Sequence, residues 1–182
     1  MTKSILLTRG HYARVDDADF PALTKHRWMY STKGYAIRAY KNDQDRWRFI
    51  HMHRVIMAAE PGQLVDHIDG DRLNNSRANL RFVTPSQNAW NAKKRCDNST
   101  GFKGVSEHPN GYLARIRYLR QRIHLGYFDN PRDAALMYDA AAATLFGEYA
   151  KINLPDEDTP PHVAAQLDKV LTRWAHKIQS HP

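Results

Sequence analysis

The stretch that decides the fold is VDHIDGDRLNNSRANLRFVTPSQNAWN, residues 65–91. It places Asp66 and His67 side by side, Asn79 twelve residues after His67, and Asn88 nine residues after Asn79. Oxygen ligands suit Mg²⁺ and Mn²⁺, and a neutral imidazole beside them can take a proton from water. The spacing therefore predicts a site for one hard metal ion with a histidine base next to it.

The residues around these four side chains predict a strand, a loop, a second strand and a helix. Strands are expected at residues 64–68 and 80–83, with Asp69-Gly70 as a turn. Thr84-Pro85 supplies a helix N-cap and a proline at the first helical position. The helix that follows would carry Asn88 towards the Asp-His pair.

This pattern resembles the HNH endonucleases, specifically the phage and intron-encoded homing type, in which (D/H)H, then N, then H or N lie on a β-hairpin followed by a helix. The resemblance implies that His67 is the general base, that Asp66 and Asn88 bind Mg²⁺ or Mn²⁺, and that Asn79 orients His67. Metal-assisted hydrolysis of a phosphodiester would leave 5′-phosphate and 3′-hydroxyl ends.

Other histidines and carboxylates near this motif leave alternatives open. Asp69 and Asp71 are interpreted as turn residues. His51 and His53 stand about 14 residues before His67 and could approach a phosphate, although a histidine at a helix start is more often structural. An isolated Asp-His pair would be only a polar hairpin.

The charge of the chain indicates a polyanionic partner. Its 182 residues carry a net charge of +8, with +5 in residues 1–90 and +6 in residues 91–128. Such an excess favours nucleic acid or an anionic membrane. No run of about 18 apolar residues and no signal-peptide core occurs, so a membrane partner is not expected. The single Cys96 excludes an internal disulfide and fits a cytoplasmic protein, in the host cell if the gene is carried by a phage.

A second unit is expected from about Gly101, with alternating strands at 102–108, 112–119 and 122–128 and an Ala-rich amphipathic helix at 129–147. The elements GV, LGYFD, AA–YD–AA, FG and N-L-P across residues 99–155 resemble the plant ethylene-response-factor (Apetala-type) DNA-binding domain. The resemblance implies that the free face of the sheet lies in the major groove of duplex DNA.

Period-two alternation divides the residues of these strands between two faces. The apolar set, expected to meet the helix, is Ala114, Ile116, Tyr118, Ile123, Leu125 and Tyr127. The set expected to face DNA is Lys103, His108, Arg115, Arg117, Arg122 and His124. Ser106, Asn110 and His124 stand where plant members carry Arg or Trp, so the plant target sequence is not implied. A solvated charged face is the alternative.

Together these expectations describe an α+β protein: a ββα-metal HNH nuclease domain followed by a three-stranded antiparallel sheet plus helix that binds DNA. The expected parts are a β-rich extension (1–50), the HNH core (51–92), a basic linker (93–100), the Apetala-type domain (101–155) and a C-terminal segment with a helix (156–182). Lys93, Lys94 and Arg95 would contact phosphates or remain solvated. The last helix would pack on its own domain or pair two chains.

The expected function is metal-dependent cleavage of duplex DNA by a homing endonuclease. A monomer would nick one strand, and a homodimer could cut both. The alternative is a DNA-binding regulator whose HNH unit is inactive. An RNA-binding or structural protein is less favoured, because no exposed aromatic platform for single strands is evident in the sequence.

Overall fold

The computed structural model describes residues 1–94 and 98–179, so Arg95 and Cys96 lie outside the described residues. The chain divides into two compact units, Met1–Ala89 and Trp90–Pro182. The fold is a mixed arrangement of small antiparallel sheets and helices, in outline the expected α+β class. The finer domain boundaries stay predictions. Within the described ranges, no helix is both long and apolar enough to cross a membrane.

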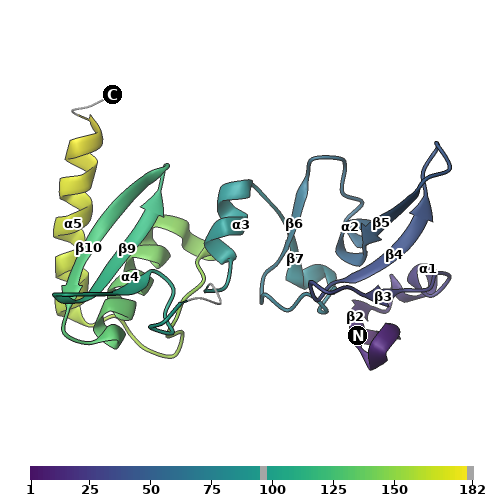
Figure 1. Ribbon diagram of the computed structural model, residues 1–182, viewed down its shortest axis with the longest axis horizontal. Coiled ribbons are helices and arrows are strands. Elements are labelled where there is room, and N and C mark those ends of the chain that lie inside the picture. Colours follow the sequence, from purple (N-terminus) through teal and green to yellow (C-terminus); the bar gives the residue numbers. More distant parts are fainter. Residues whose placement is uncertain (95–97, 180–182) are drawn as a thin grey trace. The chain divides into compact units, whose positions relative to one another are not determined.

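The first unit, Met1–Ala89, is built from short strands and helices (Figure 1). Its buried apolar side chains form one core. Its pairings are β1 with β2, β4 with both β3 and β5, and β6 with β7, all antiparallel. The elements are β1 (Thr2–Leu6), η1 (Thr8–Gly10), β2 (Tyr12–Asp16), α1 (Phe20–Leu23), β3 (Met29–Tyr30), β4 (Ala36–Lys41), β5 (Trp47–His51), α2 (Met52–Ile56), β6 (Leu64–His67), η2 (Arg77–Asn79), β7 (Leu80–Val83) and α3 (Pro85–Asn91), the last of which crosses the boundary between the units.

Trp28 lies at the centre of this core. It is 2% exposed, and its indole Nε1 donates to the Leu23 carbonyl at 2.9 Å. The buried neighbours come from β1, β2, α1, β4, α2, β7 and the residue after β1: Ile5, Leu7, Ala13, Val15, Leu23, Ala36, Met52, Ile56 and Leu80. Residues 1–50 therefore supply most of the core on which the later hairpin rests.

The sequence also predicts short helices at residues 16–25 and 51–59, and in the structure both are shorter than predicted. The helix expected at residues 16–25 is only the four-residue α1, and Asp19 at its N-cap makes no capping bond. Its carboxylate instead accepts two bonds from Arg77, at 2.9 and 2.7 Å. The helix expected from His51 to Ala59 ends at Ile56, because the backbone turns at Ala58 with φ +48°.

The hairpin and helix of the quoted stretch form as predicted. β6 and β7 pair antiparallel with His67 opposite Leu80, and α3 begins at Pro85. Thr84 and Gln87 cap this helix reciprocally. The Thr84 N–H donates to Gln87 Oε1 at 2.8 Å, and the Gln87 N–H donates to Thr84 Oγ1 at 3.2 Å. This capping box fixes the first turn of α3 directly after the hairpin.

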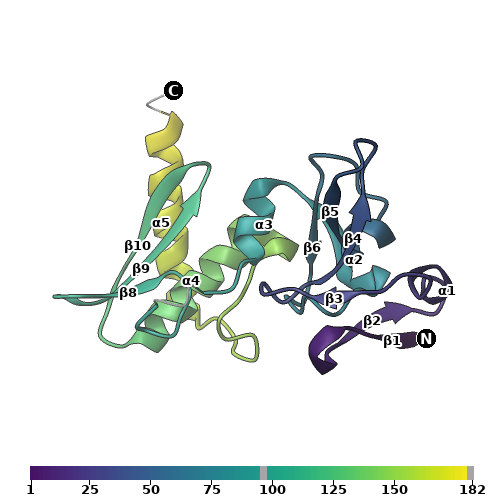
Figure 2. The same ribbon diagram turned by 45° about the vertical axis from the view of Figure 1, so that its right-hand side comes forward.

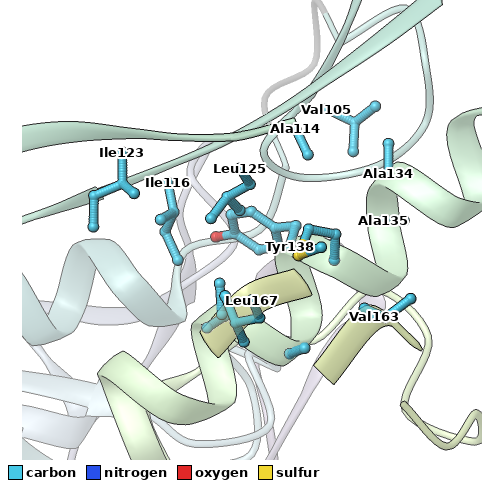
Figure 3. Packing of buried hydrophobic residues seen from close by; sticks show 14 of the residues in the cluster. Val105, Ala114, Ile116, Ile123, Leu125, Ala134, Ala135, Tyr138, Val163 and Leu167 are labelled. Atoms are coloured by element: carbon cyan, nitrogen blue, oxygen red, sulfur yellow. The ribbon is translucent and has the colours of Figure 1, made fainter. Parts of the chain in front are cut away.

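The second unit packs one sheet face against two helices. The sheet order is β10–β9–β8, and α5 lies along the β9–β10 hairpin in two views (Figures 1 and 2). Figure 3 shows strand residues such as Ile116 and Leu125 meeting Tyr138 of α4 and Leu167 of α5. The helix α5 thus packs on its own unit. The elements are β8 (Val105–His108), β9 (Gly111–Tyr118), β10 (Gln121–Phe128), α4 (Pro131–Phe146), η3 (Gly147–Tyr149) and α5 (Pro161–Gln179).

The first strand of this sheet is shorter than predicted and starts at Val105 rather than Phe102. Gly104 turns the chain with φ +80°, and a Cβ there would lie 1.9 Å from the Tyr138 ring. Only glycine allows both this backbone conformation and this close approach to α4.

A buried carboxylate ties this turn to the end of the unit. Asp139 of α4 is 6% exposed and accepts bonds from the Asn153 and Leu154 N–H groups. Asn153 in turn accepts from the Lys103 N–H at 2.7 Å. The N-L-P ending therefore has a structural role, because it satisfies a carboxylate that α4 buries.

Candidate functional site

The Asp-His pair lies at the end of β6. Asp66 is directly opposite Arg81 on β7, and their side chains form an ion pair at 3.4 Å with 12% and 11% of their surfaces exposed. Successive strand residues point to opposite faces, so Asp66 and His67 leave the strand in different directions. His67 is the last residue of the strand, so it lies at the end of the hairpin where the loop begins.

His67 lies in a cluster of aromatic rings. It is 4% exposed, and its ring centroid is 4.9 Å from that of His53 in an edge-on arrangement. His51 lies 5.2 Å from His53 by the same measure. The Tyr35 ring contacts all three histidines at 5.1 to 6.0 Å, and the Arg72 guanidinium lies 4.7 Å from its centre.

A buried carboxamide holds the His67 ring. Asn75 is fully buried, and its Oδ1 lies 3.4 Å from His67 Nε2. Because a carboxamide oxygen only accepts, this bond assigns the proton of a neutral ring to Nε2. The Asn75 N–H donates to the Arg14 carbonyl at 2.7 Å, so the loop and β2 are joined at this residue.

The histidines of this cluster are held neutral by burial. Desolvation lowers the pKa of His67, although the Asn75 hydrogen bond and the Asp66 charge oppose this. Desolvation, followed by the charges of His67, His51 and Arg54, lowers the pKa of His53 to about 3. A neutral imidazole is the form that can accept a proton, so His67 is in the state that a general base requires.

Asn79 closes the loop between the two strands. Its carbonyl accepts from the Ile68 N–H at 2.9 Å, and its Oδ1 accepts from the Asp69 N–H at 3.0 Å. Its Nδ2 donates to Asp69 Oδ1 and to the Asn74 carbonyl, both at 2.8 Å. These bonds fix the backbone on the C-terminal side of His67.

Asp69 and Asp71 are turn residues, as interpreted from the sequence. Asp69 accepts from the Asp71 N–H at 2.8 Å and Asp71 from the Leu73 N–H at 3.0 Å. Burial raises the pKa of Asp69, but the bonds from Asn74, the Asp71 backbone and Asn79 outweigh it and lower the pKa overall. The loop is therefore organised around an ionised carboxylate.

The donor chemistry of Asp66 and Asn88 fits a hard cation in part. Mg²⁺ often takes only one or two protein oxygens, with waters and substrate phosphate completing the shell. Asn88 is exposed on α3, with its N–H donating to the Thr84 carbonyl at 3.0 Å. Across residues 1–94 and 98–179, no three His, Cys, Asp or Glu side chains form a group that could hold a metal. The proposed ion would thus depend on phosphate oxygens of the substrate.

Three contributors to this site were missed by the sequence interpretation. Tyr35 comes from the turn just before β4, Asn75 from the polar loop, and Arg81 from the returning strand. Arg81 could have been found, because the predicted hairpin register places it opposite Asp66. Neither Tyr35 nor Asn75 carries such a signal, since Asn in a polar loop normally indicates a turn.

The free sheet face of the second unit carries a basic and aromatic surface, here called the outer face. Arg117 and Arg122 lie directly opposite each other, and Arg115 lies opposite His124. Like charges placed opposite in a sheet destabilise it, so this arrangement favours an anionic partner over a structural role. The members of the outer face are His108, Arg115, Arg117, Arg122, His124 and Tyr127.

Two predicted orientations in this unit are wrong. A β-bulge between His124 and Gly126 shifts the alternation, so Tyr127 points outward with 43% exposure instead of towards the helix. Its ring lies 4.6 Å from His108 and 4.8 Å from His124. Lys103 precedes β8 and does not join the outer face, because its ammonium donates to the Trp90 and Ala92 carbonyls. Burial, followed by the Lys151 charge, lowers its pKa to about 8.

The basic linker is only partly described. Lys93 and Lys94 are exposed, as a phosphate contact or a solvated linker requires. Arg95 lies outside the described residues. Their contact with DNA stays a prediction.

Known proteins that resemble this chain match its N-terminal and C-terminal parts differently. The HNH endonuclease family matches residues 51–90. HNH endonuclease L560 of Acanthamoeba polyphaga mimivirus is 32% identical over 149 residues, which covers 81% of this chain and 78% of that protein. Protein 3.8 of Escherichia phage T7 is 47% identical over 45 residues, 25% of this chain and 37% of that protein.

The second part matches plant proteins. Ethylene-responsive transcription factor ERF069 of Arabidopsis thaliana is 33% identical over 111 residues, 58% of this chain and 68% of that protein. No solved structure matches the chain significantly. The chain belongs to the HNH endonuclease family. Its C-terminal part is of the Apetala/ethylene-response-factor type.

Proposed function

We propose that this protein is a metal-dependent DNA endonuclease of the homing type, which hydrolyses phosphodiester bonds in duplex DNA. The observation that carries the proposal is His67, which is buried, neutral and held by Asn75 at the end of the hairpin that bears Asp66. Membership of the HNH endonuclease family supports the reaction class.

In this proposal His67 takes the proton of the water that attacks phosphorus, and the 3′ oxygen leaves. The products are 5′-phosphate and 3′-hydroxyl ends. Asn79 supports the reaction by fixing the loop after His67, and Asn75 by fixing the ring. Asp66 and Asn88 would hold Mg²⁺ or Mn²⁺, which when bound supplies electrostatic stabilisation of the charge on the phosphate.

The outer face of the second unit would hold the duplex. Arginine can clamp phosphate or bind guanine bidentately, and Arg117 and Arg122 stand close together on one surface. The names of the plant relatives describe transcription factors, and their similarity to this unit supports duplex DNA as the partner. Lys93 and Lys94 would add contacts that do not depend on sequence.

A supercoiled plasmid mixture carrying random inserts tests the proposal, with Mg²⁺ or Mn²⁺ present and the new ends mapped by sequencing. The wild type should produce nicked or linear DNA with 5′-phosphate ends, and EDTA should stop the reaction. His67→Ala should lose about 10²- to 10⁴-fold in cleavage rate while binding DNA as before. Binding without cleavage by the wild type would instead support the alternative, a DNA-binding regulator with an inactive HNH unit.

A further inference from the structure

Two aromatic side chains of β5 do not belong to the apolar core and are largely exposed to solvent. Trp47 is 65% exposed and Phe49 is 63% exposed. They lie on the β4–β5 hairpin, whose tip projects from the first unit in Figure 1. The sequence interpretation found no exposed aromatic platform, and the structure corrects it. Grouped exposed apolar side chains commonly mark a binding surface.

The strand register shows which residues share a face with these rings. Lys41 pairs with Trp47, Ala39 with Phe49, and Ile37 with His51, and directly opposite residues lie on the same face. The other face turns inward, because Ala36 is 2% exposed and the Arg38 guanidinium lies 5.8 Å from the Trp28 ring centre. The aromatic pair therefore lies on the outward face, together with His51.

This face is continuous with the candidate catalytic cluster. His51 belongs to the chain of rings that leads through His53 to His67, with centroid separations of 5.2 and 4.9 Å. A strand rises by about 3.3 Å per residue, which places Phe49 about 7 Å and Trp47 about 13 Å along the strand from His51. The two rings are thus about two base-stacking steps of ~3.4 Å apart.

The charges around the rings suit a polyanion. The Lys41 ammonium lies 5.7 Å from the Trp47 ring centre, on the same face of the hairpin. Arg46 is exposed near the turn, and Arg48 is exposed on the other face, since it pairs with Tyr40. The acidic residues of the turn are Asp43 and Asp45, of which Asp45 binds Lys41 at 2.6 Å. Residues 38–48 carry four basic and two acidic side chains, and of the basic ones only Arg38 packs inward, on the Trp28 ring. Aromatic rings set among basic side chains are typical of surfaces that stack on nucleic-acid bases.

From this register, exposure and charge we infer that Trp47 and Phe49 form a base-stacking site for nucleotides that leave the double helix next to the cut phosphate. The inference rests on the proposed function, since it takes the cut phosphate to lie at His67. The rings would hold one DNA strand in an opened form near the proposed catalytic histidine, and Lys41, on the same face as Trp47, would contact its phosphates.

Binding of the full-length protein to two labelled duplexes tests the site, one fully paired and one with three mismatched pairs in the middle, in EDTA so that no cleavage occurs. The ratio of the two affinities cancels the contribution of the outer face. The wild type should prefer the mismatched duplex, and the double variant Trp47→Ala/Phe49→Ala should lose at least about tenfold of that preference. Trp47→Phe should retain most of it. Tyr12→Ala, which removes another exposed aromatic residue of the first unit (58% exposed), should leave it unchanged.

Equal affinities for the two duplexes, or a double variant that keeps the wild-type preference, would overturn the inference. The inference would also be overturned if the wild type is a dimer and the double variant is a monomer, because the rings would then form an interface between two copies of the chain. The readout is binding, so this result is separate from the proposed function. If the protein cleaves DNA but binds both duplexes equally, the proposed function stands and the stacking site is contradicted. If it prefers the mismatched duplex but does not cleave, the stacking of bases is supported and the proposed function is contradicted.

Discussion

The two units place their functional residues differently with respect to their cores. In the first unit the candidate catalytic residue is itself buried, along with His53, Asn74, Asn75 and Asn79. In the second unit the core is almost wholly apolar and the candidate DNA-binding residues lie on the opposite, exposed face of the sheet. Stability and function are therefore coupled in the first unit and separable in the second.

The difference follows from what each site has to do. A histidine that acts as a general base must be neutral and its ring must be fixed, and burial and hydrogen-bond partners supply both. A surface that binds phosphates needs charge that remains hydrated until the partner arrives. The first unit meets its need with carboxamides such as Asn75, and the second with arginines supported by an apolar layer beneath them.

The largest expected effect comes from a core substitution in the second unit, and it tests whether the two units lose stability independently. Gly104→Ala should destabilise that unit by about 4 kcal/mol, because the new Cβ would meet Tyr138 and the backbone has φ +80°. Hydrogen exchange should show lost protection in β8–β10 while the amides of Trp28 and Met52 keep theirs.

Gly62→Ala provides the matched control. Gly62 has φ +87°, but a Cβ there would meet nothing within 4 Å. Its cost should be only the backbone strain, about 1 kcal/mol. If both variants cost the same, the contact between Gly104 and α4 does not have the role described.

The response to acid should differ in sign between the units. Unfolded His53 takes up a proton near pH 6.5, whereas the folded protein keeps it neutral down to about pH 3. Below pH 6.5 the unfolded chain binds more protons, so the free energy of unfolding of the first unit falls, by about 2 kcal/mol from this group between pH 7 and 5. The lowered pKa values of His51 and His67 act in the same direction.

Asp139 has the opposite effect on the second unit. Burial raises its pKa above 3.8, despite the bonds from Asn153 and Leu154. Between 3.8 and that raised value the folded state binds more protons, so acidification through this window favours folding. Denaturant unfolding at steps from pH 7 down to pH 4, followed by hydrogen exchange in each unit, checks both signs. A free energy of unfolding of the first unit that does not change with pH would contradict this account. So would a pH dependence that is the same in the wild type and in His53→Leu.

The smallest effect concerns the outer face. Arg117→Ala should change the free energy of unfolding by less than about 0.5 kcal/mol, with a slight gain possible because Arg122 stands opposite. DNA affinity should fall, and the slope of log affinity against log salt should drop by about one. A large loss of stability would show that these arginines are structural.

Much of this molecule could be predicted because local patterns decide it. The β6–β7 hairpin, the Thr84-Pro85 helix start and the two faces of β9 follow from alternation and capping chemistry. The failures arose where a single backbone feature overrides the pattern. The bulge before Gly126 turned Tyr127 outward, and the turn at Gly104 removed Lys103 from the sheet.

Only those residues of the candidate site that lie close together in the sequence could be predicted. Asp66, His67 and Asn79 come from one hairpin, so their spacing shows that they belong together. Tyr35 and His53 approach His67 through tertiary packing, which no spacing in the sequence encodes. Asn75 reads as an ordinary loop residue until its burial is known.

The central claim, that one unit cuts and the other holds, is tested most directly by measuring cleavage rate and DNA affinity on the same mapped site. His67→Ala should bind like the wild type and fail to cut. The triple variant Arg115→Ala/Arg117→Ala/Arg122→Ala should bind weakly but reach the wild-type cleavage rate when DNA is saturating. A triple variant that cannot cut at saturation, or a His67→Ala protein that still cuts, would contradict the claim.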